Sequence, residues 1–158
     1  MAEILSVLKH DIRPVARATS ETGQRGELLA AEYLARTGYR LVLSNFKVPI
    51  GRNSRGAAVT GEIDLIAIDG DKLCFVEVKT KTSDEFAAPL ATVTLRKQRQ
   101  ITRTARVYRR VFGLNDMPYR YDVVSIVLKP EAEPHVELIK GFWTESRFRK
   151  RTWNGDIY

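Results

Sequence analysis

Two apolar segments, 62–68 and 72–79, are joined by the tight-turn sequence Asp69-Gly70-Asp71, and this pair limits the fold more than any other feature. Both segments alternate with the period of two that is typical of a β-strand, and the short connection favours a β-hairpin. Both faces of the second segment are apolar, which indicates a strand inside a sheet. The hairpin nevertheless contains Asp64, Glu77 and Lys79, and charged groups placed in such strands need an explanation.

The turn limits where the two carboxylates lie. If Gly70-Asp71 is a two-residue loop, Asp64 lies directly opposite Glu77; if Asp69-Gly70 is the loop, Asp64 faces Phe75 and Glu77 is diagonal to it. Either register puts both carboxylates on one face, with Cβ atoms about 5–8 Å apart, and only a loop of odd length separates them. Like charges at this spacing repel, and a divalent cation between them reverses that effect. Hard oxygen ligands favour Mg²⁺ or Mn²⁺.

Two further charged groups are predicted to join this pair. Lys79 points to the same face as Glu77, where a lysine can position or deprotonate a water at the metal, or stabilise charge on phosphorus. Glu27 lies on the stripe of Ala31 and Leu34 in a predicted helix, so this carboxylate leans inward and can reach the metal directly or through water. Taken singly, each group has an ordinary explanation as a solvated ion pair, a surface acid or an exposed helix glutamate. Their predicted convergence favours a functional site.

The remaining segments predict a single α/β domain over 1–158. The predicted elements are a helix at 22–36, a strand at 39–46, a mobile basic loop at 47–60, a helix at 94–112, a strand at 119–128 and a short last strand at 136–139. Thr22 is the expected N-cap of the first helix and Gly38 the glycine that ends it. The order helix, strand, strand, strand, helix, strand indicates a mixed central sheet flanked by helices. Residues 1–20 are an N-terminal extension, and 140–158 are a basic tail.

The chain is basic, with 26 Lys and Arg residues against 19 Asp and Glu residues and a net charge of +7. Folded basic proteins commonly bind polyanions, above all nucleic acid. No acidic residue lies between Arg96 and Arg110, whereas a helix face that is merely solvated usually mixes charges of both signs. The predicted nucleic-acid-binding residues are Arg52, Arg55, Arg96, Lys97, Gln98, Arg99, Arg103 and Arg106.

Several classes of protein are excluded by residue content. One cysteine, Cys74, and two histidines, His10 and His135, exclude an internal disulfide, a cysteine zinc cluster and histidine-based metal nuclease motifs. The N-terminus does not read as a secretory signal, and no apolar run approaches the roughly 18 residues that a membrane span needs. We therefore expect a cytoplasmic protein with no membrane partner.

Several motifs resemble those of one known family. Gly23-Gln-Arg-Gly26-Glu27, Gly61-Glu-Ile-Asp-Leu-Ile-Ala, Phe75-Val-Glu-Val-Lys79 and Arg120-Tyr-Asp-Val-Val124 are similar, in this order, to motifs of the YraN-like family of the PD-(D/E)XK nuclease superfamily. That superfamily includes restriction endonucleases and Holliday-junction resolvases. The resemblance covers residues 22–142 and implies a restriction-endonuclease-like fold. The stretch between Asn45 and Gly61 is longer than expected for the family.

The resemblance implies a metal-dependent endonuclease that hydrolyses phosphodiester bonds in DNA. Asp64 and Glu77 would be metal ligands together with the backbone carbonyl of Val78, Lys79 the catalytic lysine and Glu27 the supporting acid, with Mg²⁺ or Mn²⁺ as cofactor. The sequence holds no evident base-reading element, so branched or junction DNA is the expected substrate, and a homodimer is suggested by the superfamily alone. The rival hypotheses are a non-catalytic nucleic-acid-binding module with the nuclease fold, an RNase-H-like nuclease, and a protein that binds an acidic partner.

Overall fold

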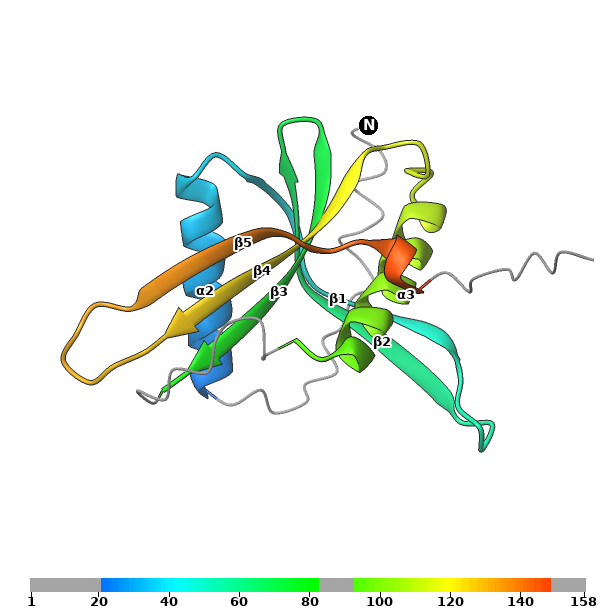
Figure 1. The fold of residues 1–158 in the computed structure, drawn as a ribbon, viewed down its shortest axis with the longest axis horizontal. Coiled ribbons are helices and arrows are strands. Elements are labelled where there is room, and N and C mark those ends of the chain that lie inside the picture. Colours follow the sequence, from blue (N-terminus) through cyan, green and yellow to red (C-terminus); the bar gives the residue numbers. More distant parts are fainter. Residues whose placement is uncertain (1–20, 83–92, 149–158) are drawn as a thin grey trace, which may run out of the picture.

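Five strands and two long helices make up the computed structural model, which describes residues 21–82 and 93–148 (Figure 1). In chain order the elements are α2 (Glu21–Arg36), β1 (Arg40–Arg52), β2 (Ala58–Asp69), β3 (Lys72–Lys81), α3 (Leu95–Val111), β4 (Tyr119–Val127), β5 (His135–Trp143) and a short 3-10 helix (Glu145–Phe148). The strands form one sheet in the order β1-β2-β3-β4-β5. Only β3 and β4 run parallel; the other neighbours are antiparallel.

The two helices pack on opposite faces of the sheet. Ala30 and Leu34 of α2 join a buried cluster that includes Cys74 and Val76, whereas Phe75 belongs to a second cluster with residues of α3. Because successive residues of a strand point to opposite faces, the two clusters lie on the two sides of β3. This confirms the expected class: a mixed α/β sheet flanked by helices, consistent with a restriction-endonuclease-like fold, in which the short last strand expected at 136–139 is a full strand, β5.

The β2–β3 hairpin has the first of the two expected registers. Asp69 pairs with Lys72 and Leu65 with Val76, so Gly70-Asp71 is the two-residue loop. Gly70 has φ +62, in the left-handed region that glycine tolerates at no steric cost. The recorded pairing of the two strands ends at Leu65 and Val76, although both strands continue past this point.

The segment 47–60 is not the mobile loop that the sequence suggested. β1 continues to Arg52 and β2 begins at Ala58, so the two strands form a long ribbon and only 53–57 make the turn. Register shifts between Leu41 and Leu43 and between Pro49 and Gly51 mark bulges in β1. A bulge lets a strand absorb an extra residue without losing its pairing, which is why residues typical of loops sit within a strand here.

The C-terminal prediction also needs correction. The last strand is much longer than 136–139, and it takes up the first residues of the supposed basic tail. Trp143 is buried and stacks on Tyr121 with ring centroids 4.8 Å apart and an interplanar angle of 9°. Residues 1–20 and 149–158, which contain the expected extension and the rest of the tail, lie outside the described residues.

The first helix departs from expectation at one end. Thr22, the expected N-cap, is already inside α2, which begins at Glu21. At the other end Gly38 has φ +96 and follows the last helical turn, as predicted for the glycine that ends the helix. No helix in the described part of the chain is long and apolar enough to cross a membrane.

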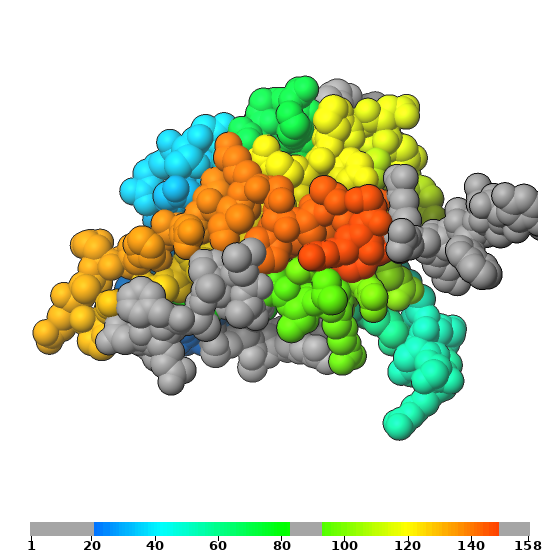
Figure 2. All heavy atoms as spheres, viewed as in Figure 1, coloured from blue at the N-terminus to red at the C-terminus, as the bar shows by residue number. Residues whose placement is uncertain are grey.

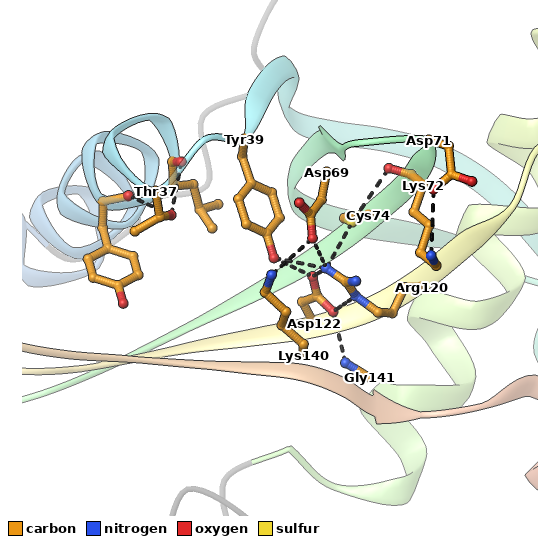
Figure 3. A network of polar contacts seen from close by, with 12 residues as sticks. Thr37, Tyr39, Asp69, Asp71, Lys72, Cys74, Arg120, Asp122, Lys140 and Gly141 are labelled. Atoms are coloured by element: carbon orange, nitrogen blue, oxygen red, sulfur yellow. Dashed lines mark hydrogen bonds and ion pairs between the residues drawn. The ribbon is translucent and has the colours of Figure 1, made fainter.

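A polar cluster holds the turn end of the hairpin to the rest of the sheet (Figure 3). Its centre is Arg120 on β4, whose guanidinium donates to Asp122 at 2.7 Å and to Asp69 at 2.8 Å. We call this the Arg120 cluster; its members are Arg120, Asp122, Asp69, Tyr39, Lys140 and Gly141. The single cysteine lies beside it: Cys74 is fully buried, and burial raises the pKa of its thiol to about 12.

Candidate functional site

The sheet divides where the predicted carboxylates lie. Beyond Leu65, β2 stays paired with β1, whereas β3 beyond Val76 stays paired with β4. Figure 1 shows β1 and β2 leaving together toward one side, past α3, while β3 continues in another direction. Asp64 and Glu77 are the residues directly after the last recorded pair, so they sit at the point of divergence. The divergence of the strands, which we call the fork, therefore brings both acidic side chains to the place where the β2–β3 pairing ends.

Glu77 is the most buried acid of this region. Its side chain is 3% exposed, and Lys79 Nζ lies 3.0 Å from Oε1. Lys97 Nζ, from the first turns of α3, lies 3.6 Å from Oε2. Oε2 itself has no hydrogen-bond partner among the described residues. Buried carboxylate oxygens are normally hydrogen-bonded, and one that is not commonly marks a position where a ligand or ion belongs.

Asp64 is held in place by its neighbour strand. The backbone N–H of Val78 donates to Oδ2 at 2.8 Å. This side-chain contact takes the place of the backbone pairing between β2 and β3, which has ended here. Burial, followed by the negative charge of Glu77, raises the pKa of Asp64 to about 8. A carboxyl whose pKa is raised by burial and a like charge is the arrangement that a cation relieves.

Glu27 reaches the same region from α2. Gly26 lets this happen, because a Cβ there would lie 1.8 Å from Thr80 Oγ1, so only glycine allows the helix to approach β3 so closely. Glu27 is half-buried, and its pKa is raised mainly by burial and also by the charges of Glu62 and Glu77. The third predicted carboxylate therefore influences the site, at its margin.

Asn45 of β1 is a site residue that the sequence reading missed. Its neighbours Ser44 and Phe46 pair with Leu65 and Ile63, which sets Asn45 across from Asp64. Its backbone has φ 54, in the left-handed region that asparagine tolerates better than most residues, and its side chain hydrogen-bonds the carboxyl of Glu27. An asparagine in a strand was the only signal available, and it does not reveal a left-handed backbone.

We call the group formed by Asp64, Glu77, Lys79, Lys97 and Glu27 the Glu77 site. Among the described residues no group of three or more His, Cys, Asp or Glu side chains is placed to hold a metal. A cation here would have two carboxylates, Asp64 and Glu77, with the predicted backbone carbonyl of Val78 beside them. The donor set fits a divalent cation that takes oxygen ligands and keeps several waters, because one carboxylate oxygen lacks a partner and the two acids repel.

The predicted nucleic-acid-binding residues do not form one free surface. Gln98 is buried, its amide donating to Val93 O and accepting from Arg147, and Lys97 points to Glu77. Several arginines are engaged within the protein: Arg99 lies over the Phe148 ring, Arg103 donates to Ile50 O, Arg106 pairs with Glu145 at 3.0 Å, and Arg52 donates to Gly56 O. Arg55 and Arg96 are exposed.

Glycine also brings α3 against the sheet near the site. A Cβ on Gly61 would lie 1.9 Å from Thr104 Oγ1, so at this position the backbone of β2 contacts a side chain of α3 directly. The contact fixes the height of α3 over the sheet and with it the reach of Lys97 to Glu77. The glycines of two sequence motifs thus have one role: each lets a helix approach the fork closely.

Comparisons with known proteins give one consistent result. The uncharacterised protein family UPF0102 matches residues 26–126. A UPF0102 protein of Chlorobium limicola is 38% identical over 130 residues, covering 78% of this chain and 93% of that protein. One from Geobacter sulfurreducens is 42% identical over 118 residues, covering 74% and 84%.

A crystal structure of SSO0001 has a TM-score of 0.39 and 17% identity, covering 79% of this chain and 53% of that one, so this chain spans about half of it. Such a distant likeness has no bearing on activity. The two UPF0102 relatives establish the family of this chain, because an identity of 38–42% extends over most of both chains. The chain belongs to the uncharacterised protein family UPF0102, the YraN-like family that its motifs resemble.

Proposed function

We propose that this protein is a metal-dependent endonuclease that hydrolyses phosphodiester bonds in DNA. One observation carries the proposal: buried Glu77 has an oxygen without a hydrogen bond, beside a second buried acid and between two lysines. A structural ion pair would need one lysine and no second acid. Two carboxylates with two ammonium groups suit a site that binds both a cation and an anion, which a phosphodiester with its metal provides.

The chain's own groups would divide the work. Asp64 and Glu77 would hold Mg²⁺ or Mn²⁺, with the Val78 carbonyl beside them, and the cation would supply Lewis-acid stabilisation of charge on the phosphate. Lys79 is 33% exposed at its side chain, so it can reach a substrate while paired to Glu77. Its ammonium group would orient the attacking water and stabilise negative charge on the phosphate oxygens. Water would attack phosphorus and release a proton to solvent, the bond to the departing oxygen would break, and that oxygen would take up a proton from solvent.

Charge and shape support DNA as the substrate. The net charge of +7 attracts a polyanion, and the exposed arginines of α3 lie on the same helix as Lys97, so a phosphate backbone that reaches the Glu77 site would pass them. Contacts to phosphates fix position and carry no sequence information, which favours a substrate defined by structure, such as branched DNA. A second copy of the chain would supply the second cut that a junction needs.

The second candidate is a non-catalytic nucleic-acid-binding module with the same fold. The engagement of Arg99, Arg103 and Arg106 in internal contacts does not distinguish the two, because the remaining cations suffice for weak binding. Glu77 Oε2 favours the enzyme, since a module that binds only phosphates has no use for a buried carboxylate oxygen that lacks a hydrogen bond.

The test compares two lysine variants on DNA. The protein is incubated with duplex, single-stranded and branched DNA in Mg²⁺, in Mn²⁺ and in EDTA, beside Lys79→Ala and Lys72→Ala. Lys72 lies at the hairpin turn, exposed and 3.5 Å from Asp71, so its variant loses the same charge far from the Glu77 site. We expect cleavage in Mg²⁺ or Mn²⁺ by the natural chain and by Lys72→Ala, with a loss of at least 100-fold in Lys79→Ala.

Two results would contradict the proposal. Binding to all DNA forms with no cleavage under any metal would favour the binding module. Cleavage that persists in EDTA, or in Lys79→Ala at the natural rate, would show that the Glu77 site is not where the reaction occurs.

A further inference from the structure

The ribbon made by β1 and β2 beyond the fork is a projection with no role in the Glu77 site itself. We call it the arm; it comprises Phe46–Arg52 of β1, the turn 53–57, and Ala58–Ile63 of β2. Figure 1 shows it running past α3, and in Figure 2 its tip stands clear of the body. We infer that the arm is a duplex-binding element that enters a groove of DNA bound at the Glu77 site. This inference rests on the proposed function, whose substrate it narrows.

The arm is fixed to α3 partway along its length. Arg103 donates from its guanidinium to Ile50 O, and Gln100 donates from its amide to Thr60 O at 3.0 Å. Both contacts are made by side chains of a helix to backbone carbonyls of the ribbon, one on each strand. With Gly61 pressed against Thr104, they set the direction in which the arm leaves the body.

The tip is ordered by its own hydrogen bonds. Asn53 Oδ1 accepts from the backbone N–H of Arg55 at 2.9 Å and of Ala57 at 3.0 Å. The Asn53 N–H donates to Ala57 O at 2.9 Å, which closes the loop. Gly56 has φ +77, the left-handed conformation that such a turn needs. An arm that is already ordered loses little conformational entropy when it binds, which favours affinity.

The charge of the arm is of one sign over most of its length. From Phe46 to Gly61 the sequence contains Lys47, Arg52 and Arg55 and no acid. Lys47 pairs with Glu62 at the base, 3.4 Å away. At the tip, Arg52 donates one nitrogen to Gly56 O, and no acid in the described residues pairs with the guanidinium of either arginine. Two cations without counter-charges at the end of a projection suit phosphates.

The dimensions of the arm match those of DNA. Two strands lie about 4.8 Å apart, and a two-stranded ribbon with its side chains fits a major groove about 12 Å wide. From Phe46 to Arg52 the ribbon extends about 20 Å at about 3.3 Å per residue. A base-pair step is about 3.4 Å, so the arm is about as long as six base pairs of duplex. A single strand has no groove, so the arm should distinguish duplex from single-stranded DNA.

The test measures binding in EDTA, so that it does not depend on cleavage. The probes are a fluorescein-labelled duplex of 30 base pairs and the single strand of the same sequence, followed by anisotropy between 50 and 200 mM NaCl. The variant is Arg52→Gln/Arg55→Gln. Its matched control is Arg36→Gln/Arg40→Gln, which removes one exposed arginine at the end of α2 and one at the start of β1, both far from the tip, and changes the net charge equally.

The tip variant should lose duplex affinity, and the slope of log K against log salt should fall by about two, one for each phosphate contact. The control and the single strand should change little. A second variant joins Pro49 to Thr60, which are paired, through Asn-Gly, and so removes the tip while keeping the register; it should lose the preference for duplex as well. Melting curves show whether each variant folds.

The inference and the proposed function fail separately. If the natural chain cleaves DNA and Lys79→Ala does not, but the tip variant binds duplex as before, the inference about the arm is overturned and the enzyme stands. If nothing is cleaved but the tip variant loses duplex affinity, the inference stands and the enzyme does not. If the tip variant loses duplex and single-stranded binding equally, the inference about the arm is overturned, and the arm is a general cationic patch. If the tip variant loses only self-association, the inference is also overturned, and the arm contacts a second copy of the chain.

Discussion

The two ends of the β2–β3 hairpin carry acids in opposite circumstances. At the turn, Asp69 and the buried Asp122 of β4, which share Arg120, receive hydrogen bonds from Arg120, Lys140, a tyrosine and a backbone N–H. At the fork, Asp64 has one recorded donor and Glu77 has an oxygen with none. The pKa of Asp69 is lowered by its partners, whereas burial and Glu77 raise that of Asp64. The acids at the turn are therefore stabilised by hydrogen bonds and cations, whereas the acids at the fork have fewer hydrogen-bond donors, and their mutual repulsion destabilises the folded state when both are ionised.

The largest effect should come from removing a charge at the satisfied end. Asp122→Asn leaves Arg120 with a neutral partner in a buried position, and we expect a loss of about 3 kcal/mol in the free energy of unfolding. Urea denaturation measures it. An exposed change on the same sheet, Glu137→Gln, should shift the free energy by less than about 0.5 kcal/mol. A loss below about 1 kcal/mol in Asp122→Asn would show that the acids at the turn end do not stabilise the fold more than those at the fork.

The same substitution at the fork should have the opposite sign. Asp64→Asn removes a carboxyl whose ionisation is opposed by burial and by Glu77, and it keeps an oxygen to accept from Val78 N, so stability at neutral pH should rise by about 1 kcal/mol without metal. Ten millimolar MgCl₂ should raise the melting temperature of the natural chain by a few degrees at pH 7.5, with choline chloride at equal ionic strength as control. Asp64→Asn should lose that response. A magnesium response that survives the substitution would place the cation elsewhere.

The two ends should also respond oppositely to pH. The pKa of Asp64 is raised from its ordinary value to about 8, so the folded state holds this proton more tightly than the unfolded chain, and the stability it gives is lost as pH rises toward and through 8. The pKa of Asp69 is lowered, so its contribution is present above its ordinary pKa and is lost on acidification.

Urea midpoints between pH 2 and pH 9 in EDTA measure both effects. The difference between the natural chain and Asp64→Asn should grow from pH 5 to pH 9, while the difference from Asp69→Asn should be present down to about pH 4 and shrink below it. Parallel curves for the natural chain and Asp64→Asn would show that this carboxyl ionises normally.

The smallest expected effect is at Asn45, which joins β1 to the fork. Asn45→Gly fits φ 54 without strain, whereas Asn45→Ala does not, so alanine should cost about 1 kcal/mol more than glycine. Both lose the hydrogen bond to Glu27. If that bond positions Glu27, both variants should cleave DNA several-fold more slowly and to a similar degree, despite their different stabilities. Natural cleavage rates in Asn45→Gly would assign Asn45 a purely structural role.

The sequence allowed much of this site to be predicted, because strand alternation and a tight turn are local properties. Asp69-Gly70-Asp71 limited the hairpin to two registers, and both brought Asp64 near Glu77. Lys97 lies four residues before Ile101, which places both on one face of α3, and it reaches Glu77. Local periodicity was sufficient to predict the direction of a side chain wherever that direction depends on a single strand, helix or turn.

Other features depend on contacts between distant segments. Gly51, Asn53 and Gly56 read as a loop, because the sequence does not show that bulges let a ribbon absorb such residues. Trp143 read as part of a tail, since its stacking on Tyr121 joins two strands. Gln98 was expected to contact nucleic acid, yet the distant Arg147 and the nearby Val93 carbonyl occupy its amide.

The single cysteine gives the molecule an experimental property of its own. Cys74 is 0% exposed and its thiol has a pKa of about 12, so at neutral pH it is neither accessible nor ionised. Thiol-reactive dyes should therefore leave the folded natural chain unlabelled. A cysteine introduced at Ser54, on the tip of the arm, would be the one reactive thiol of the protein. A fluorophore at that position would report the approach of a DNA duplex in real time, against a background free of other labels.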